Sequence, residues 1–234
     1  MQLLITRPLE QNIITGERLS KIGHSVIAEP LLTITALETP FPDDEITGTI
    51  LTSINALDAL SKSPVDKEML LFTNGLTTQQ AAQQVGFTNG IAVEGTVAEL
   101  VKVIPLMLQA ADPQIENPRL LYPCAQETAG DVPALLQTHN ISCLPWPVYQ
   151  TTPSAAFSDS TRHLLQNGEI DAVLLYSSKT ARCFAKLMMG LKWPDVYALS
   201  GQIAAQLPRQ IQEKANFPDT PNEEALFALL TDYK

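Results

Sequence analysis

The sequence predicts an α/β protein with two parallel-sheet lobes joined by a two-stranded β linker. Short apolar segments alternate with segments of helical periodicity along most of the 234 residues, a pattern typical of parallel sheets covered by helices on both faces. Residues 50–56 are echoed at residues 175–181, about 125 positions later. Each stretch is an apolar run, two hydroxyl residues and the start of a helix. The repeat indicates two similar lobes, with a ligand expected between them.

Further echoes show how the chain is divided. Gly75 has a counterpart in Gly201 at a similar offset. Residues 3–6 match residues 120–123 at a shorter offset, and in this pair the order of the two copies along the chain is reversed. Chance similarity within ordinary α/β sequence is the alternative explanation. These echoes, together with that of residues 99–100 at 225–226, occur in a consistent order and favour a true repeat in which one copy is assembled from both chain ends.

The predicted division follows from this order. We expect a terminal lobe formed by residues 1–30 plus 152–234, an inserted lobe at residues 36–145, and a β linker of residues 31–35 and 146–151.

The individual elements follow from periodicity and from turn residues. The first helix, at 9–22, is expected from its apolar residues and ends at Gly23, and the strand after it stops at Pro30. Further strands are expected near 48–52, 69–73, 91–94, 119–122, 141–144, 171–176 and 195–199. Further helices are expected near 54–62, 77–85, 95–110, 127–138, 158–166, 178–190, 201–213 and 222–232.

Composition excludes several classes of function. The chain is 45 % hydrophobic and 17 % charged, which favours a packed core over disorder. A net charge of −10 argues against a nucleic-acid partner. The short apolar run before Arg7 and Pro8 predicts neither a signal peptide nor a membrane span. Cys124, Cys143 and Cys183 lack metal or redox spacing and are expected to be buried free thiols.

Charge is distributed unevenly along the chain. Residues 31–150 hold 4 Lys and Arg against 13 Asp and Glu, a net of −9, and the rest of the chain holds 11 against 12, a net of −1. An anionic ligand is therefore expected to bind the terminal lobe more strongly.

The predicted ligand site lies where the strands of each lobe end, because helix N-termini there present free N–H groups and a positive dipole end. Short hydroxyl residues cluster at these ends. Each one alone is also explained as a helix N-cap. The candidate substrate-binding residues are Arg7, Thr52, Ser53, Asn55, Ser177, Ser178, Lys179, Thr180, Ser200 and Gly201.

Other site chemistries find no support in the sequence. No phosphate-loop or dinucleotide glycine pattern is present, which disfavours nucleotides. His24, His139 and His163 are scattered without metal-ligand spacing. The ligand expected on these grounds is a molecule with several carboxylates.

An ordered set of segments resembles the uroporphyrinogen-III synthase family over nearly the whole chain. The order and spacing of the segments carry the resemblance. They are Leu4-Ile5-Thr6-Arg7-Pro8, Leu51-Thr52-Ser53-Ile54-Asn55-Ala56, Val148-Tyr149-Gln150-Thr151, Asp171-Ala172-Val173 leading to Ser177-Ser178, and Pro218 to Leu226.

The resemblance implies two flavodoxin-like lobes and closure of linear hydroxymethylbilane with inversion of ring D and loss of water. It also implies a cytoplasmic monomer in haem biosynthesis, without metal or organic cofactor, that could contact the upstream hydroxymethylbilane synthase transiently. Tyr149 matches the tyrosine proposed to assist hydroxyl departure; packing of the linker is the alternative role for this side chain.

Two turns depart from the family pattern. Gly201-Gln202-Ile203-Ala204 lacks the two threonines often found there, and Pro123 to Glu127 replaces an arginine–glycine turn. A non-catalytic two-lobe module that binds polycarboxylates or tetrapyrroles is therefore the main alternative, and a flavodoxin-like FMN protein is a weaker one.

Overall fold

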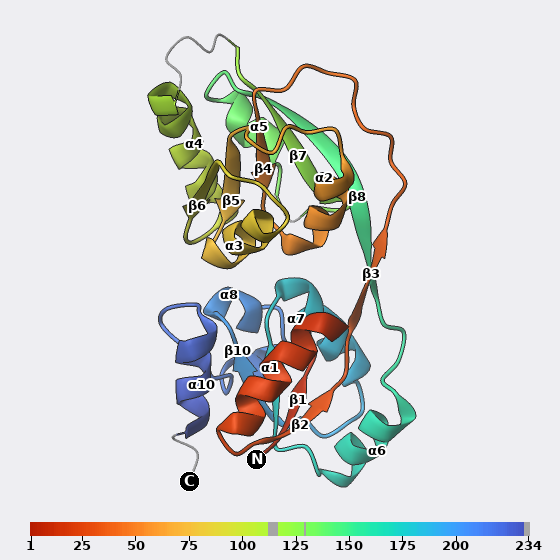
Figure 1. Ribbon diagram of the computed structural model, residues 1–234. Helices are drawn as coiled ribbons and strands as arrows, with labels where there is room; N and C mark the ends of the chain where they lie inside the picture. The colour runs from red at the N-terminus through yellow and green to blue at the C-terminus, as the bar shows by residue number, and fades with distance from the viewer. Residues whose placement is uncertain (112–116, 129, 232–234) are drawn as a thin grey trace. The chain divides into compact units, whose positions relative to one another are not determined.

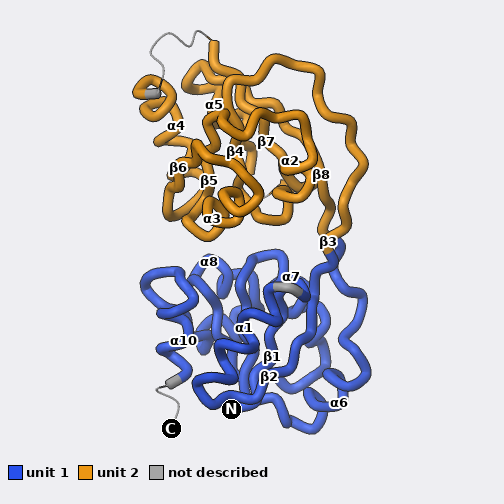
Figure 2. Tube along the Cα trace, viewed as in Figure 1, with its two compact units in different colours: residues 1–33, 152–234 blue, residues 34–151 orange. Residues whose placement is uncertain are grey.

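The computed structural model describes residues 1–111, 117–128 and 130–231, and the chain forms two compact units (Figures 1 and 2). Unit 1 comprises Met1–Thr33 and Thr152–Lys234, and unit 2 comprises Ile34–Thr151. Each unit is an α/β structure built on a parallel sheet, which confirms the predicted fold class.

The sheet of unit 1 has the strand order β10-β9-β1-β2, and all neighbours are parallel. Helices cover both faces because side chains alternate along each strand: Leu4 packs on one face, and Leu3 and Ile5 pack on the other. The strands are β1 (Gln2–Ile5), β2 (Ser25–Ala28), β9 (Ala172–Leu175) and β10 (Asp195–Ala198).

The helices of unit 1 divide between these two faces. Helices α6, α7 and α8 contribute to the core on one face, and α1 and α10 contribute to the core on the other. Their bounds are α1 (Leu9–Lys21), α6 (Asp159–Asn167), α7 (Ser178–Leu187), α8 (Gly201–Ala204), α9 (Arg209–Gln212) and α10 (Glu223–Thr231).

The sheet of unit 2 has the order β3-β8-β7-β4-β5-β6. The five strands from β8 to β6 are parallel to one another. The strands are β3 (Leu32–Ala36), β4 (Gly48–Leu51), β5 (Leu71–Asn74), β6 (Gly90–Val93), β7 (Arg119–Ala125) and β8 (Ser142–Pro153).

Helices of unit 2 also pack on both faces of its sheet. Helices α4 and α5 contribute to one core, and η1, α2 and α3 contribute to the other. Their bounds are η1 (Ile54–Ala56), α2 (Leu57–Lys62), α3 (Leu76–Gln84), α4 (Val97–Ala111) and α5 (Val132–Gln137).

Strands β3 and β8 carry the chain from one unit to the other. They run antiparallel: Leu37 N donates to Val148 O at 2.8 Å, and Ser154 N donates to Leu31 O at 3.0 Å. Strand β8 is one continuous 12-residue strand. The sequence instead predicts a short strand near 141–144 and a separate linker segment at 146–151.

The two sheets share a strand order. When β10, β9, β1 and β2 are matched with β5, β4, β7 and β8, the neighbours agree, and β6 and the linker strand β3 are the additional strands of the second sheet. The order β8-β7-β4-β5-β6 is the flavodoxin-like order 2-1-3-4-5 with the chain entering at the third strand.

The repeat holds at a different register from the one expected. Strands β4 and β9 end at Leu51 and Leu175, and the N-caps that follow are Ser53 and Ser177. The offset is therefore 124 residues, since 175 minus 51 and 177 minus 53 both give 124. Thr52 thus corresponds to Tyr176, and not to Ser177.

Two helices differ from the expectation. The helix expected at 201–213 is broken into α8 and α9, because Pro208 caps α9 and a proline disfavours helical backbone in the residue before it. In α1 only part of the apolar pattern marks the buried face: Leu19 is fully buried, but Leu9, Ile13 and Ile14 are 61 %, 56 % and 62 % exposed.

A buried carboxylate joins the end of β2 to α6 in unit 1. Glu29 accepts hydrogen bonds from Ser158 N at 2.8 Å, Ser158 Oγ at 2.6 Å and Thr161 Oγ1 at 2.6 Å. Hydrogen bonds to an ionised acceptor are stronger than neutral ones, so this contact fixes the helix against the sheet.

We expect Glu29→Gln to lower the free energy of unfolding by about 1–3 kcal/mol, because the amide nitrogen presents donors to groups that already donate. Urea unfolding measures this change. Glu17→Gln on the exposed side of α1 is the control and is expected to change stability by less than about 0.5 kcal/mol. Equal losses in both variants would contradict the structural role of Glu29.

The cysteines are held as neutral thiols by their surroundings. Cys124 is 4 % exposed in the core of unit 2, and burial raises its pKa to about 11. Burial raises the pKa of Cys143 to about 12 and also raises the pKa of Cys183. A thiol with a raised pKa stays protonated at neutral pH and is a poor nucleophile.

Iodoacetamide labelling at pH 8 tests this state. With a pKa of about 11, about one Cys124 side chain in a thousand is a thiolate at that pH. We expect slow alkylation of the folded protein and rapid alkylation in urea, followed by mass spectrometry. Rapid labelling of Cys124 in the folded protein would contradict the burial described here.

Candidate functional site

The structure brings most of the predicted site residues to the carboxyl edge of their own sheet. In unit 1, Arg7 follows β1, Ser177 follows β9 and Ser200 follows β10. These three strand ends are adjacent because β10, β9 and β1 are neighbours in parallel register. In unit 2, Thr52 and Ser53 follow β4 at the corresponding edge.

Several of the hydroxyl groups cap helices. Ser177 Oγ accepts from Thr180 N at 3.1 Å and lies 2.8 Å from Thr180 Oγ1. Ser53 Oγ accepts from Asn55 N at 3.3 Å. Thr180 is only 3 % exposed, so its hydroxyl serves the cap and is not placed for direct contact with a ligand.

The first turn of α7 presents the other predicted residues of this segment. Ser178 and Lys179 are half-buried at the start of a 10-residue helix with no acidic residue in its first turn. The first N–H groups of a helix have no partner within the helix. This end of α7 therefore favours an anion.

An aromatic ring packs against the turn after β10. A Cβ on Gly201 would lie 3.2 Å from the Phe217 ring, so a side chain at this position would displace the ring. Ser200 is the N-cap residue of α8 but makes no side-chain cap hydrogen bond. Its hydroxyl is therefore not used by the helix that it precedes.

Arg7 is held in a network that the sequence does not reveal. Its Nη1 lies 2.8 Å from Glu223 Oε1 and 3.0 Å from Thr15 Oγ1, and its Nε donates to Gln11 Oε1 at 3.1 Å. The guanidinium lies over the Tyr176 ring, 4.3 Å from the centroid. Glu223 is separated from Arg7 by 216 residues, and no local pattern signals the pairing.

Two tyrosines lie near the carboxyl edge of unit 2. The Tyr122 hydroxyl lies 3.3 Å from Thr52 Oγ1, and burial raises the pKa of Tyr122. Tyr149 is 8 % exposed, and its carbonyl accepts from Gln126 N at 2.8 Å. Within the described residues the Tyr149 hydroxyl has no hydrogen bond, so it is available to a ligand. Tyr122 is not among the predicted substrate-binding residues, although the sequence places the segment from Tyr122 to Gln126 at a strand end.

Acidic side chains already occupy two helix N-termini of unit 2. Glu94 Oε1 accepts from Leu76 N at 2.8 Å at the start of α3, and Glu99 Oε2 accepts from Thr96 N at 2.6 Å before α4. The Thr96 hydrogen bonds lower the pKa of Glu99. These ends of unit 2 therefore bind carboxylates of the protein itself.

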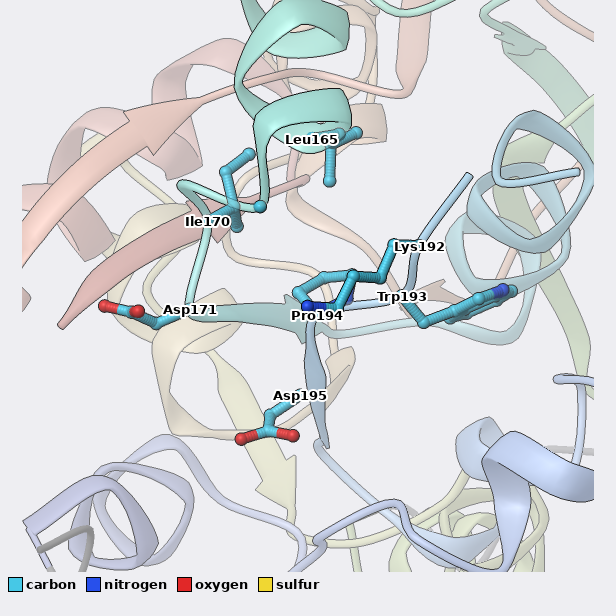
Figure 3. A pocket seen from close by; sticks show the side chains of 8 residues that line it. Leu165, Ile170, Asp171, Lys192, Trp193, Pro194 and Asp195 are labelled. Carbon is cyan, nitrogen blue, oxygen red and sulfur yellow. The ribbon is translucent and has the colours of Figure 1, made fainter. Parts of the chain in front are cut away.

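A pocket in unit 1 lies away from the carboxyl edge (Figure 3). Asp171 and Asp195, at the amino ends of β9 and β10, line it together with Lys192 and Trp193. Asp171 Oδ2 accepts from Gln2 N at 2.6 Å. Helix N-termini do not point to the amino edge of a parallel sheet, so this pocket lacks the features that favour an anion.

The described part of the chain contains no group of three or more His, Cys, Asp or Glu side chains arranged to hold a metal ion. Within the same residues, no helix has both the length and the apolar character needed to cross a membrane.

Solved structures of uroporphyrinogen III synthases are similar to the chain. The uroporphyrinogen-III synthetase of Helicobacter pylori 26695 gives a TM-score of 0.66 at 16 % identity and covers 100 % of this chain and 99 % of that one. A mutant uroporphyrinogen III synthase of the extremely thermophilic bacterium Thermus thermophilus gives 0.58 at 14 % identity and covers 100 % and 97 %. These likenesses support the two-lobe α/β fold.

The sequence comparisons are more specific about the family. No curated protein sequence matches the chain. The family model described as uroporphyrinogen-III synthase HemD matches residues 15–228, which is most of the 234 residues. The chain therefore belongs to the uroporphyrinogen-III synthase family, the cyclising lyases that convert hydroxymethylbilane to uroporphyrinogen III in haem biosynthesis.

Proposed function

We propose that the chain binds the carboxylates of hydroxymethylbilane at the carboxyl edges of its two sheets, and that the Tyr149 hydroxyl assists departure of the substrate hydroxyl. The observation that carries this proposal is the gathering of Arg7, the first turn of α7 and the turn at Ser200 at adjacent strand ends of unit 1. The substrate has eight carboxylates, and these groups supply directional donors for several of them.

Unit 1 supplies most of the anion binding in this proposal. Arg7, Ser178 and Lys179 offer charged or hydroxyl donors beside the first N–H groups of α7, and Ser200 and Gly201 offer a further turn. Ser177 and Thr180 contribute through the cap that holds α7 in place. An acidic protein can bind a polyanion in this way because the backbone N–H groups of helix N-termini bind anions without adding cationic side chains.

Unit 2 supplies fewer sites for substrate carboxylates, and it supplies the Tyr149 phenol as the acid. Thr52, Ser53 and Asn55 lie after β4, while the starts of α3 and α4 are filled by Glu94 and Glu99. Strand β1 of unit 1 matches strand β7 of unit 2. Arg7 lies two residues after Ile5, and Cys124 lies two residues after Tyr122, so Cys124 is the residue that corresponds to Arg7. A neutral thiol there removes the cation that unit 1 has.

The chemistry requires positioning more than acid strength. Departure of the hydroxyl leaves an azafulvene cation, and attack by the substituted carbon of ring D gives a spiro intermediate that rearranges to the inverted ring. Unassisted closure gives the uninverted isomer. Holding the ring D carbon against the cation therefore decides the product.

The Tyr149 phenol contributes a hydrogen bond to the leaving oxygen. A phenol with a reference pKa near 10 is a weak acid, and its contribution is on the order of 10²-fold or less. The ring is packed in the core with Leu121, Trp146 and Val148, which orients the hydroxyl.

The proposal extends to the setting of the reaction. The chain acts as a cytoplasmic monomer and receives its substrate through transient contact with hydroxymethylbilane synthase. Family membership and the reactivity of the free linear tetrapyrrole support this assignment. Sedimentation of the purified chain tests the monomer.

Incubation with freshly prepared hydroxymethylbilane tests the activity. We expect isomer III to predominate among the products after oxidation and chromatographic separation, with isomer I predominating in the reaction without protein. Isomer I as the sole product in both reactions would overturn the proposal in favour of a binding module.

Tyr149→Phe is expected to lower kcat by about 10- to 100-fold. The free energy of unfolding is expected to fall by less than about 1 kcal/mol, because the ring keeps its packing and no internal hydrogen bond is lost. Rates and urea unfolding are measured on the same samples. Tyr197→Phe, in the core of unit 1, is the control and is expected to retain kcat; an unchanged kcat in Tyr149→Phe would remove its catalytic role.

A further inference from the structure

We propose that Glu223 is a positioning residue that holds Arg7 so that the second terminal nitrogen of its guanidinium binds a substrate carboxylate. The inference rests on the proposed function and assigns a role to a residue outside the strand-end turns. Glu223 begins α10, whereas the predicted binding residues of unit 1 belong to the turns after β1, β9 and β10.

The Glu223 carboxylate is shared between two arginines. Its Oε1 accepts from Arg7 Nη1 at 2.8 Å and from Thr15 Oγ1 at 2.9 Å, and its Oε2 pairs with Arg18 Nη1. The side chain of Glu223 is 17 % exposed, so these partners satisfy a carboxylate that is mostly withdrawn from water. Removal of its charge would leave the Arg7 and Arg18 cations without this bridge.

Internal contacts engage two of the three nitrogens of the Arg7 guanidinium. A guanidinium has five N–H donors. Nη1 donates to Glu223 and Thr15, and Nε donates to Gln11. Within the described residues the two N–H groups of Nη2 have no partner, and the side chain is 24 % exposed. The two N–H groups of Nη2 diverge, and each can donate a single charge-assisted hydrogen bond to a carboxylate oxygen.

The Tyr176 ring restricts the guanidinium from a third direction. Arg7 Cζ lies 4.3 Å from the ring centroid, a cation–π geometry that favours stacking of the guanidinium. Burial, and next the nearby Glu223 carboxylate, raise the pKa of Tyr176, so the phenol stays neutral and does not compete with the substrate as an anion. Arg7 is thus fixed by an acid, two polar side chains and a ring.

The ion pair changes what Arg7 contributes. Glu223 offsets much of the Arg7 charge, so long-range attraction is weak, and the contribution to binding comes from the orientation of Nη2. Loss of Glu223 leaves the Arg7 charge in place but frees the side chain to move. The inference therefore predicts weaker substrate binding on removal of an acidic residue, which is the opposite of what simple charge repulsion predicts for a polyanionic substrate.

The experiment is a double-mutant cycle of Glu223→Gln and Arg7→Met in the full chain. Methionine keeps an apolar stem against Tyr176 and removes the donors. KM and kcat are measured with hydroxymethylbilane, and Kd is measured in parallel from the fluorescence of uroporphyrin III. We expect each single variant to raise KM and Kd about tenfold with kcat changed less than about threefold, and the double variant to raise them no further.

Glu224→Gln is the matched control. Glu224 is the next residue and pairs with Arg18 Nη2 at 2.9 Å, but its side chain is 75 % exposed and it does not contact Arg7. We expect KM and Kd to stay within about twofold of the wild type. Thermal unfolding of all variants identifies any loss of binding that is due to misfolding, and Arg7→Lys replaces Arg7→Met if the latter does not fold.

The outcomes separate the inference from the proposed function. An unchanged KM and Kd in Glu223→Gln would overturn the inference, and so would a double variant about 100-fold weaker than wild type, the product of independent effects. A wild-type protein that forms no isomer III would instead contradict the function, while the uroporphyrin titrations would still decide whether Glu223 acts through Arg7.

Discussion

Parallel pairing of β1 with β9 is the interaction on which the rest of the architecture depends. Leu3 pairs with Ala172 and Ile5 pairs with Leu174, so residues close to the N-terminus form a sheet with residues far along the chain. Because the two strands are neighbours, unit 1 must be assembled from both chain ends and the chain must cross between units twice. The same pairing places the end of β1 beside the end of β9, and it thereby brings Arg7 over the Tyr176 ring.

The two units share strand order but not electrostatics. Where unit 1 has Arg7 beside Tyr176, the matched strands of unit 2 have Cys124 and Thr52, and burial keeps the thiol neutral. Carboxylates of the protein also fill helix N-termini in unit 2, as Glu94 does for α3. A fold repeated with unequal charge is expected to bind an anion unequally, and the proposed site in unit 1 would reconcile a net charge of −10 with membership of a family that acts on a polycarboxylate.

Much of the fold could be predicted from the sequence because parallel α/β units combine buried strands with periodic helices. The details that failed depend on tertiary packing. Most apolar residues of α1 do not mark its buried face, which is formed by Leu19 together with Asn12 and Thr15, both 1 % exposed. The repeat register was wrong by one residue because sequence similarity aligned hydroxyl residues, whereas the structure aligns the N-caps Ser53 and Ser177. Glu223 could not be found, because its partners are distant in sequence and the pairing exists only after folding.

The reaction explains why a cation in such a site is held by an acid. A flexible arginine bound by charge alone would accept a carboxylate in many orientations, and each would place ring D differently. Arg7 is instead restricted by Glu223, Thr15 and Tyr176, so in the proposed site its orientation would be fixed before the substrate arrives and less entropy would be lost on binding. The ion pair weakens the long-range attraction between Arg7 and an anionic substrate, but it narrows the range of orientations that Arg7 can adopt. When the uncatalysed reaction is fast and gives the other isomer, geometry is the property that determines the product, and a neutralised but well-oriented arginine is suited to that task.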